Sequence, residues 1–156
     1  MKIQIIHAGE FKEKYLREAA AEYTKRIAPM AEISDVFVKE RIINTPSEIE
    51  KALEDEGREI LSKIDDRAFV IALCVEGQGL SSEELAKTLE KSTVMSYPST
   101  SFIIGSSHGL SESVKKRANL RLSFSKMTFP HQLMRVILLE QIYRALTILK
   151  GTKYHK

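Results

Sequence analysis

The chain has 156 residues and a mass of 17.7 kDa, the size of one domain with one hydrophobic core. Hydrophobic residues make up 43% of it and charged residues 29%, which excludes a mostly disordered or low-complexity chain. No apolar run approaches the ~18 residues of a membrane span, and the start lacks the apolar segment of a signal peptide. We therefore expect a single domain over residues 1–156, located in the cytoplasm and without a membrane partner.

Charge is distributed unevenly along the chain. Residues 115–156 contain ten Lys or Arg and one acidic residue, a formal charge of +9, whereas residues 1–114 carry −6. A basic end of this kind predicts attraction to a polyanion, with an affinity that falls as salt rises. A solvated basic face is the alternative that charge alone leaves open.

The single cysteine, Cys74, excludes an internal disulfide and a multi-thiolate metal site. It stands in the apolar run 71–75, so we predict a buried structural thiol. The four histidines lack HExxH spacing, and neither a GxxxxGK[ST] loop nor a complete GxGxxG fingerprint occurs. We expect no metal, and the motifs support neither hydride transfer nor triphosphate hydrolysis.

Hydrophobic periodicity and end signals predict alternating strands and helices. In chain order they are a strand at 2–8, a helix at 11–27, a strand at 33–38, a helix from 46 to about 64, a strand at 68–75, a helix at 82–90, a strand at 101–104, a short helix after Ser111, a strand at 120–124 and a helix at 130–150. Such alternation, with no internal repeat, indicates an α/β layer fold with a mostly parallel sheet.

Short motifs mark several boundaries of these elements. Residues 45–48, TPSE, match a capping box with proline at the first helical position, and SSEE at 81–84 caps the following helix. Ser111 is the expected cap of the short helix. The glycines at 77–79 are predicted to end the third strand, and Gly151 the last helix.

Three loops follow the C-terminal ends of predicted strands, after Leu73, Ile104 and Leu122. Ligands bind at this edge in open α/β sheets. The last of these loops runs to Pro130 with no Ser, Asp or Asn directly before it, so free backbone donors there can receive a ligand. A cap by Thr128 is the alternative.

Residues 105–109, GSSHG, fit the GxSxG pattern of a nucleophile elbow between a strand and a helix. Ser107 would then be activated by His155, oriented by Glu140. However, Glu140 stands four residues before Arg144 within a helix, a spacing that favours a surface ion pair. We keep a serine hydrolase as an alternative and interpret the two glycines as turn residues.

The C-terminal part contains one long motif, LSFSKMTFPHQLMRVILLEQIYRA at 122–145, and the chain ends in YHK. Shorter motifs precede it at 12–15, 22–23, 73–77, 80–83, 102–105 and 109–110. Together they closely resemble the RlmH family of SPOUT-class methyltransferases, which methylate N3 of a pseudouridine in 23S ribosomal RNA. The resemblance covers the whole chain and implies the same reaction here.

The resemblance also implies a fold and a cofactor site. The expected fold is α/β, a mostly parallel sheet with flanking helices and a C-terminal trefoil knot whose loops hold S-adenosyl-L-methionine in a bent form. The implied cofactor contacts are Leu73, Gly105, Phe124, Ser125, Lys126, Met127, Thr128 and Phe129. Many relatives have Gly-Gly where this chain has Gly105-Ser106, so the second position need not be glycine here, and His108 is interpreted as a surface variant.

The implied reaction is an in-line attack by an imide nitrogen on a sulfonium methyl group, so the imide proton must leave. Our hypothesis is that Arg135 stabilises the resulting anion, that His155 accepts the proton, and that Tyr154 stacks on the base. The alternatives are that Arg135 only holds a phosphate or pairs with Glu140, and that His155 is a frayed terminal residue.

Partners follow from the last helix and the basic end. Apolar residues go round much of the helix, which fits burial on two sides and a homodimer. The RNA partner is expected to be the large subunit or the whole ribosome rather than DNA, and the competing hypothesis is a non-catalytic ribosome-binding protein. The phosphate-attracting residues are predicted to be Lys115, Lys116, Arg117, Arg121, Lys150, Lys153 and Lys156.

Overall fold

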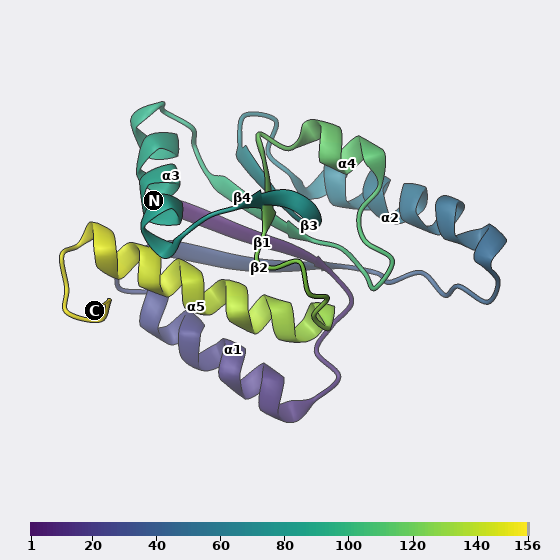
Figure 1. The fold of residues 1–156 in the computed structure, drawn as a ribbon, viewed down its shortest axis with the longest axis horizontal. Helices are drawn as coiled ribbons and strands as arrows, with labels where there is room; N and C mark the ends of the chain where they lie inside the picture. The colour runs from purple at the N-terminus through teal and green to yellow at the C-terminus, as the bar shows by residue number, and fades with distance from the viewer. Residues whose placement is uncertain (156) are drawn as a thin grey trace.

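The computed structural model describes residues 1–155, and its centre is a five-stranded sheet. The strands are β1 (Lys2–Ala8), β2 (Glu32–Val38), β3 (Phe69–Gly79), β4 (Thr100–Ile104) and β5 (Leu120–Ser123). They lie in the order β2-β1-β4-β3-β5, and every neighbouring pair is parallel (Figure 1). The predicted α/β fold with a parallel sheet is confirmed.

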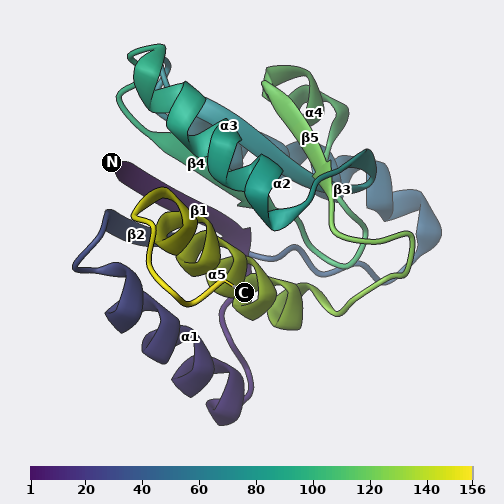
Figure 2. The same cartoon turned by 60° about the vertical axis from the view of Figure 1, so that its left-hand side comes forward.

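Helices cover both faces of the sheet. They are α1 (Lys14–Ile27), α2 (Ile49–Lys63), which the 3-10 turn η1 (Pro46–Glu48) precedes, α3 (Ser82–Val94), α4 (Glu112–Arg117) and α5 (His131–Leu149). On one face α5 lies between α1 and α3, and on the other α2 packs against α4 (Figures 1 and 2). The long apolar helix α5 is therefore flanked on both sides within one chain.

Alternate residues of the central strands face two separate cores. In β1, Ile5 packs beneath α1, α3 and α5, whereas Ile6 packs beneath α2 and α4. Phe102 and Ile103 divide in the same way in β4. Successive side chains of a strand point to opposite faces, so a sheet covered on both faces needs continuous apolar runs. Such a run is the signal that predicted the strand at 68–75.

Strand β3 is longer than the predicted strand at 68–75, because its pairing with β5 continues to Gly79. The register with β5 shifts between Leu73 and Gln78, which marks a bulge. A Cβ at Gly77 would lie 2.7 Å from the backbone carbonyl carbon of Leu122, so only glycine allows β5 to approach this closely. The predicted end at residue 75 was too early, because the strand ends at Gly79 and Gly77 accommodates a bulge before that end.

The helix caps were predicted with mixed success. In α3 the N–H of Glu84 donates to Ser81 Oγ at 3.1 Å, and the N–H of Ser81 donates to Glu84 Oε2 at 2.7 Å, so this capping box is confirmed. The box at Thr45 does not form, because Glu48 accepts the N–H of Asn44 at 2.8 Å and the chain makes a 3-10 turn instead. Cap formation depends on the backbone path before the helix, which the motif does not specify.

The other helix ends agree with the sequence in part. Helix α1 begins at Lys14, three residues later than predicted, and Ser111 caps α4. Gly151 follows α5 with a φ of 66°, as predicted for a helix-ending glycine. None of the helices in residues 1–155 is both long and apolar enough to cross a membrane. The trefoil knot stays a prediction.

Candidate active site

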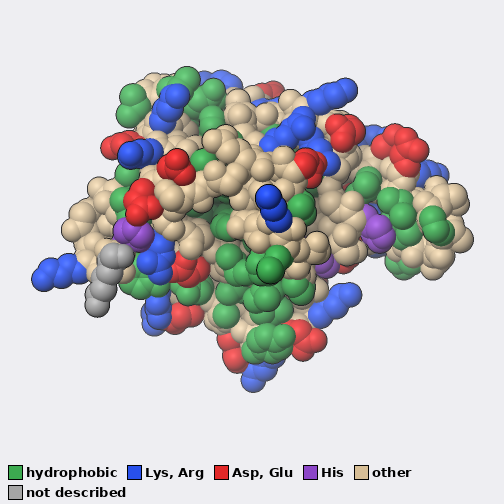
Figure 3. All heavy atoms as spheres, in the orientation of Figure 1, with side chains coloured by type: hydrophobic (Ala, Val, Ile, Leu, Met, Phe, Trp, Pro, Cys, Tyr) green, Lys and Arg blue, Asp and Glu red, His purple; other side chains and the backbone are tan. Residues whose placement is uncertain are grey.

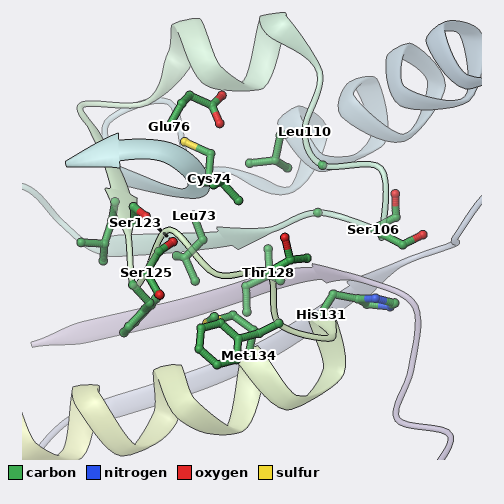
Figure 4. A pocket seen from close by; sticks show the side chains of 18 of the residues that line it. Leu73, Cys74, Glu76, Ser106, Leu110, Ser123, Ser125, Thr128, His131 and Met134 are labelled. Carbon is green, nitrogen blue, oxygen red and sulfur yellow. Dashed lines mark hydrogen bonds between the residues drawn. The ribbon is translucent and has the colours of Figure 1, made fainter. Parts of the chain in front are cut away.

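A cavity of about 370 Å³ lies at the carboxyl-terminal edge of the sheet, where the loops after β3, β4 and β5 meet the first turn of α5 (Figure 4). Its volume is in the range of small-molecule sites, roughly 300–1,000 Å³. Seven of the eight residues that the family resemblance assigned to the cofactor line it, and Lys126 alone is outside the lining. The three loops predicted from the C-terminal ends of the strands therefore line one cavity. Binding of a cofactor by these residues stays a prediction.

The loop after β4 is a tight turn. The N–H of Gly109 donates to the carbonyl of Ser106 at 2.9 Å, and Gly109 has a φ of 90°. A Cβ on Gly105 would lie 2.2 Å from the carbonyl oxygen of Gly109, so glycine is required there by the loop's own backbone. Ser106 is buried at the second position without disturbing the turn, so this position does not need glycine.

The loop after β5 is shaped by its own serines. Ser123 Oγ donates to the carbonyl of Ser125, and the N–H of Met127 donates to Ser125 Oγ, both at 3.0 Å. No side chain caps the N-terminus of α5, so the alternative that Thr128 is the cap was wrong. Beside this uncapped end, His131 lines the cavity, and its buried Nε2 makes no hydrogen bond within residues 1–155 and lies 3.8 Å from Glu40 Oε2. Backbone and imidazole groups are thus available to a ligand.

Cys74 is half-buried and lines the cavity, so the prediction of a buried structural thiol was wrong. The reason is the bulge in β3, which takes residues 74–77 out of regular pairing with β5 and turns this part of the strand toward the cavity. Burial raises the pKa of the thiol, and the nearby charge of Glu76 raises it further.

One ion pair stands in the cavity wall. Lys115 Nζ lies 2.5 Å from Glu76 Oε1, and both residues line the cavity. The hydrogen bond lowers the pKa of Glu76 and raises the pKa of Lys115, so the pair is charged at neutral pH. Lys115 is therefore engaged within the protein, which weakens its predicted role as a phosphate contact.

Arg135 lies outside the cavity lining, on the part of α5 that covers the ends of β1 and β2. Its guanidinium is bound to the carboxylate of Asp35 and sits 3.8 Å from the ring centroid of Phe11. His7 joins the group, with Nε2 3.0 Å from Asp35 Oδ1. The residue is 8% exposed, and its buried Nε has no hydrogen-bond partner within residues 1–155, so the guanidinium is held by internal contacts outside the cavity. Neither His7 nor Asp35 carried a motif that could have identified this cluster from the sequence.

Tyr154 and His155 fold back from the C-terminal end of α5 to lie against its middle and against the start of α3, outside the cavity lining. The Tyr154 hydroxyl donates to Glu140 Oε1 at 3.1 Å, and Arg144 donates to the same carboxylate at 2.7 Å. His155 Nε2 lies 2.7 Å from Glu83 Oε1 at the start of α3. The tail is thus held against α3 and α5 rather than frayed, and neither residue lines the cavity of its own chain.

The same contacts separate the residues of the alternative hydrolase triad. Glu140 pairs with Arg144, and His155 pairs with Glu83. Ser107 Oγ lies 3.4 Å from Nδ1 of its neighbour His108. A triad requires the serine, the histidine and the acid in one hydrogen-bonded chain, and this structure does not provide it.

The basic residues of the C-terminal part divide into two groups. Arg117 donates to the backbone carbonyls of Asp65, Asp66 and Ala68 at 3.0–3.3 Å, and Arg121 donates to the carbonyl of Lys115 at 3.3 Å. These two side chains support the fold. Within residues 1–155, no ion pair engages Lys116, Lys150 or Lys153, and Lys156 lies outside the described residues. Figure 3 shows basic side chains gathered over α4 and hydrophobic ones over the N-terminal half of α5.

Residues 1–155 match a family model described as "Predicted SPOUT methyltransferase". The chain belongs to the SPOUT methyltransferases. Two proteins named "Ribosomal RNA large subunit methyltransferase H", from Streptococcus pneumoniae strains CGSP14 and JJA, are 51% identical to it over 161 residues, covering 100% of both chains in each comparison. The resemblance to the RlmH family is confirmed by these relatives.

A solved structure of low sequence identity has a similar fold. It is described as "a probable methylase family protein from Haemophilus influenzae Rd KW20" and superposes with a TM-score of 0.52 at 14% identity. The match covers 97% of this chain and 67% of the other. This similarity concerns the fold, whereas the cavity and its loops bear on the chemistry.

Proposed function

We propose that this SPOUT methyltransferase transfers a methyl group from S-adenosyl-L-methionine to N3 of a pseudouridine in 23S ribosomal RNA, on the assembled ribosome. Full-length relatives at 51% identity carry the name of a ribosomal RNA large subunit methyltransferase. The observation that carries the proposal is the cavity built from three strand-end loops. Action on ribosomes by a single-domain protein is consistent with our expectation of a cytoplasmic location.

The residues around the cavity fit a nucleoside-sized methyl donor. Leu73, Ile104 and Phe124 supply apolar walls, and His131, whose Nε2 lies 3.8 Å from Glu40 and makes no hydrogen bond within residues 1–155, would offer one to the donor. The bound donor would supply a methyl group on a sulfonium centre. The loops then have two tasks, to hold the reacting groups in line and to exclude water from them.

A homodimer explains where the proposed catalytic residues act. Tyr154 and His155 do not line the cavity of their own chain, so in our proposal the C-terminal tail of a second copy completes the site. Met127 is 75% exposed and Phe129 37% exposed in the cavity lining, and Leu133 of the first turn of α5 is 37% exposed. A second copy that covers this apolar surface would remove it from water.

In the completed site, His155 would take the imide proton and Tyr154 would stack on the base. The anion-stabilising role of Arg135 stays a prediction, and its buried pairing with Asp35 means that Arg135→Ala should lower stability as well as turnover. The non-catalytic alternative is distinguished by its outcome, because such a protein would bind ribosomes without transferring a methyl group.

The first test is calorimetric titration with S-adenosyl-L-methionine, comparing Gly105→Ala with Gly79→Ala. A Cβ at Gly105 meets the Gly109 oxygen at 2.2 Å, whereas a Cβ at Gly79 meets no atom within 4 Å. We expect binding by the unaltered protein and by Gly79→Ala, and loss of binding by Gly105→Ala. Methyl transfer to ribosomes that lack this modification is the second measurement. A protein that binds the donor but leaves ribosomes unmethylated would contradict the proposed function.

A further inference from the structure

Glu56 of α2 is a buried carboxylate that the proposed mechanism does not use. It is 3% exposed and lies on the face of the sheet opposite α5. Its Oε1 accepts the backbone N–H of Ser106 at 3.3 Å. Ser106 follows Gly105 in the cavity-lining loop after β4 and is itself 8% exposed. Burying a carboxylate is costly unless hydrogen bonds compensate it, so this contact requires an explanation.

Gly57, the next residue of α2, lies against Ser111, which follows the loop after β4. A Cβ at Gly57 would lie 2.1 Å from Ser111 Oγ, the atom that caps α4. Only glycine lets the helix approach so closely, and a larger residue would push this segment away. Helix α2 therefore contacts both ends of the segment 105–111. The Glu56 carboxylate binds the N–H of Ser106 at one end, and the backbone of Gly57 lies close to Ser111 at the other.

Hydrogen bonds within the 105–110 loop fix its shape but not its position relative to the cavity. The bond from the Gly109 N–H to the Ser106 carbonyl closes a turn, and both partners belong to the loop. The position of that turn over the cavity depends on contacts with other elements. Leu110 packs with Ile60 and Val114 in the core beneath α2 and α4. Glu56 adds a directed contact to the backbone of Ser106, a loop residue that lines the cavity.

We propose that Glu56 is a positioning residue that holds the 105–110 loop, through the N–H of Ser106, in the conformation that binds the methyl donor. It acts through the loop and touches neither donor nor RNA. The inference rests on the proposed function insofar as the donor binds in this cavity.

The surroundings of the carboxyl group support a directed role. Burial raises the pKa of Glu56, and the charge of Glu40 adds to that rise, whereas hydrogen bonds from Ser106 and from the backbone of Arg41 oppose it. The donors around the carboxylate therefore come from two loops, the one after β2 and the one after β4. Glu56 joins both loops to α2.

The test compares three variants of the full-length protein by titration with S-adenosyl-L-methionine. Glu56→Met keeps the length of the side chain and removes the acceptor, while Glu56→Gln retains an oxygen for the Ser106 N–H. The matched control is Glu59→Met. Glu59 lies on the same helix, and its carboxylate pairs with Arg41 at 3.0 Å. We expect the dissociation constant to rise at least tenfold in Glu56→Met and to stay within about threefold in the other two, since hydrogen bonds to charged groups have effects of this size.

Kinetics on ribosomes separate positioning from general loss of structure. In Glu56→Met the KM for the donor should rise while kcat at saturating donor stays close to that of the unaltered enzyme. Unchanged donor affinity in a folded Glu56→Met would overturn the inference. So would weakening of the same size in Glu59→Met, because that result would mean a general effect of destabilising α2.

Amide exchange provides a readout that does not depend on the donor and starts from the unaltered protein. In the unaltered protein the Ser106 amide proton should exchange slowly, and in Glu56→Gln its protection should largely remain. Exchange at the rate of an unstructured peptide would overturn the contact. If the unaltered protein shows the protected amide but no binding of S-adenosyl-L-methionine, the donor assignment of the proposed function is wrong, whereas the bond from Glu56 to Ser106 stands.

Discussion

Replacing Asp35 with alanine leaves the guanidinium of Arg135 buried without its carboxylate. Arg135 is 8% exposed, and Asp35 is also the contact of His7 Nε2 at 3.0 Å. Breaking a buried ion pair by removing one partner costs about 3–5 kcal/mol. Because the Asp35 side chain is 45% exposed, we expect the lower end of that range. For a domain of this size, about 3 kcal/mol corresponds to a fall in melting temperature of roughly 6–12 °C.

The assay is thermal and urea unfolding of Asp35→Ala, Arg135→Met and the control Asp66→Ala. Asp66 is exposed and takes part in the fold through its backbone carbonyl. Arg135→Met should lower the free energy of unfolding less than Asp35→Ala does. The Asp35 carboxylate that remains in Arg135→Met is half-exposed, so water can solvate it. An Asp35→Ala melting temperature within 2 °C of the Asp66→Ala value would refute this reasoning. Loss of turnover in Arg135→Met at unchanged stability would instead favour the catalytic role.

The remaining predictions concern the cavity and the basic surface. Cys74 is the only thiol of the chain and lines the cavity, so S-adenosyl-L-methionine should slow its alkylation by a maleimide at least fivefold; equal rates with and without the donor would place the donor elsewhere. Because burial raises the pKa of this thiol, alkylation of the free protein should increase only at a higher pH than for a free cysteine peptide. Lys116→Ala should weaken ribosome binding and reduce its salt dependence without changing the melting temperature. Arg117→Ala should lower the free energy of unfolding by about 1–2 kcal/mol, since three backbone carbonyls lose a charged donor; an unchanged urea midpoint would contradict this.

Local signals were sufficient for most of the elements. Strand β1 coincides with its predicted range, and β2, β4, α3 and α5 lie within a few residues of theirs. The Ser81 and Ser111 caps and the positive φ of Gly151 depend on bonds and torsions within a few residues, so the sequence contains the needed information. The three strand-end loops could also be named in advance, because a parallel sheet brings the carboxyl ends of its strands to one edge.

Features that depend on contacts between distant segments could not be predicted in this way. The bulge of β3 arises where Gly77 lets β5 approach, and it turns Cys74 from a core position to the cavity. The Thr45 motif has the residues of a capping box, yet the path of the preceding loop prevents the box from forming. Glu56 had no motif at all, since its partner Ser106 lies 50 positions away in the sequence.

The sequence by itself determined the order of strands and helices, the edge of the sheet where the cavity lies, and the family, because hydrophobic periodicity and long motifs are written along the chain. Only the tertiary structure decided which charged residues are available for function. It engaged Lys115, Arg117 and Arg135 in internal contacts, and it placed Tyr154 and His155 away from the cavity of their own chain. The physical reason is that pairing and burial of a charge depend on groups brought together by folding, and the residue type alone does not contain that information.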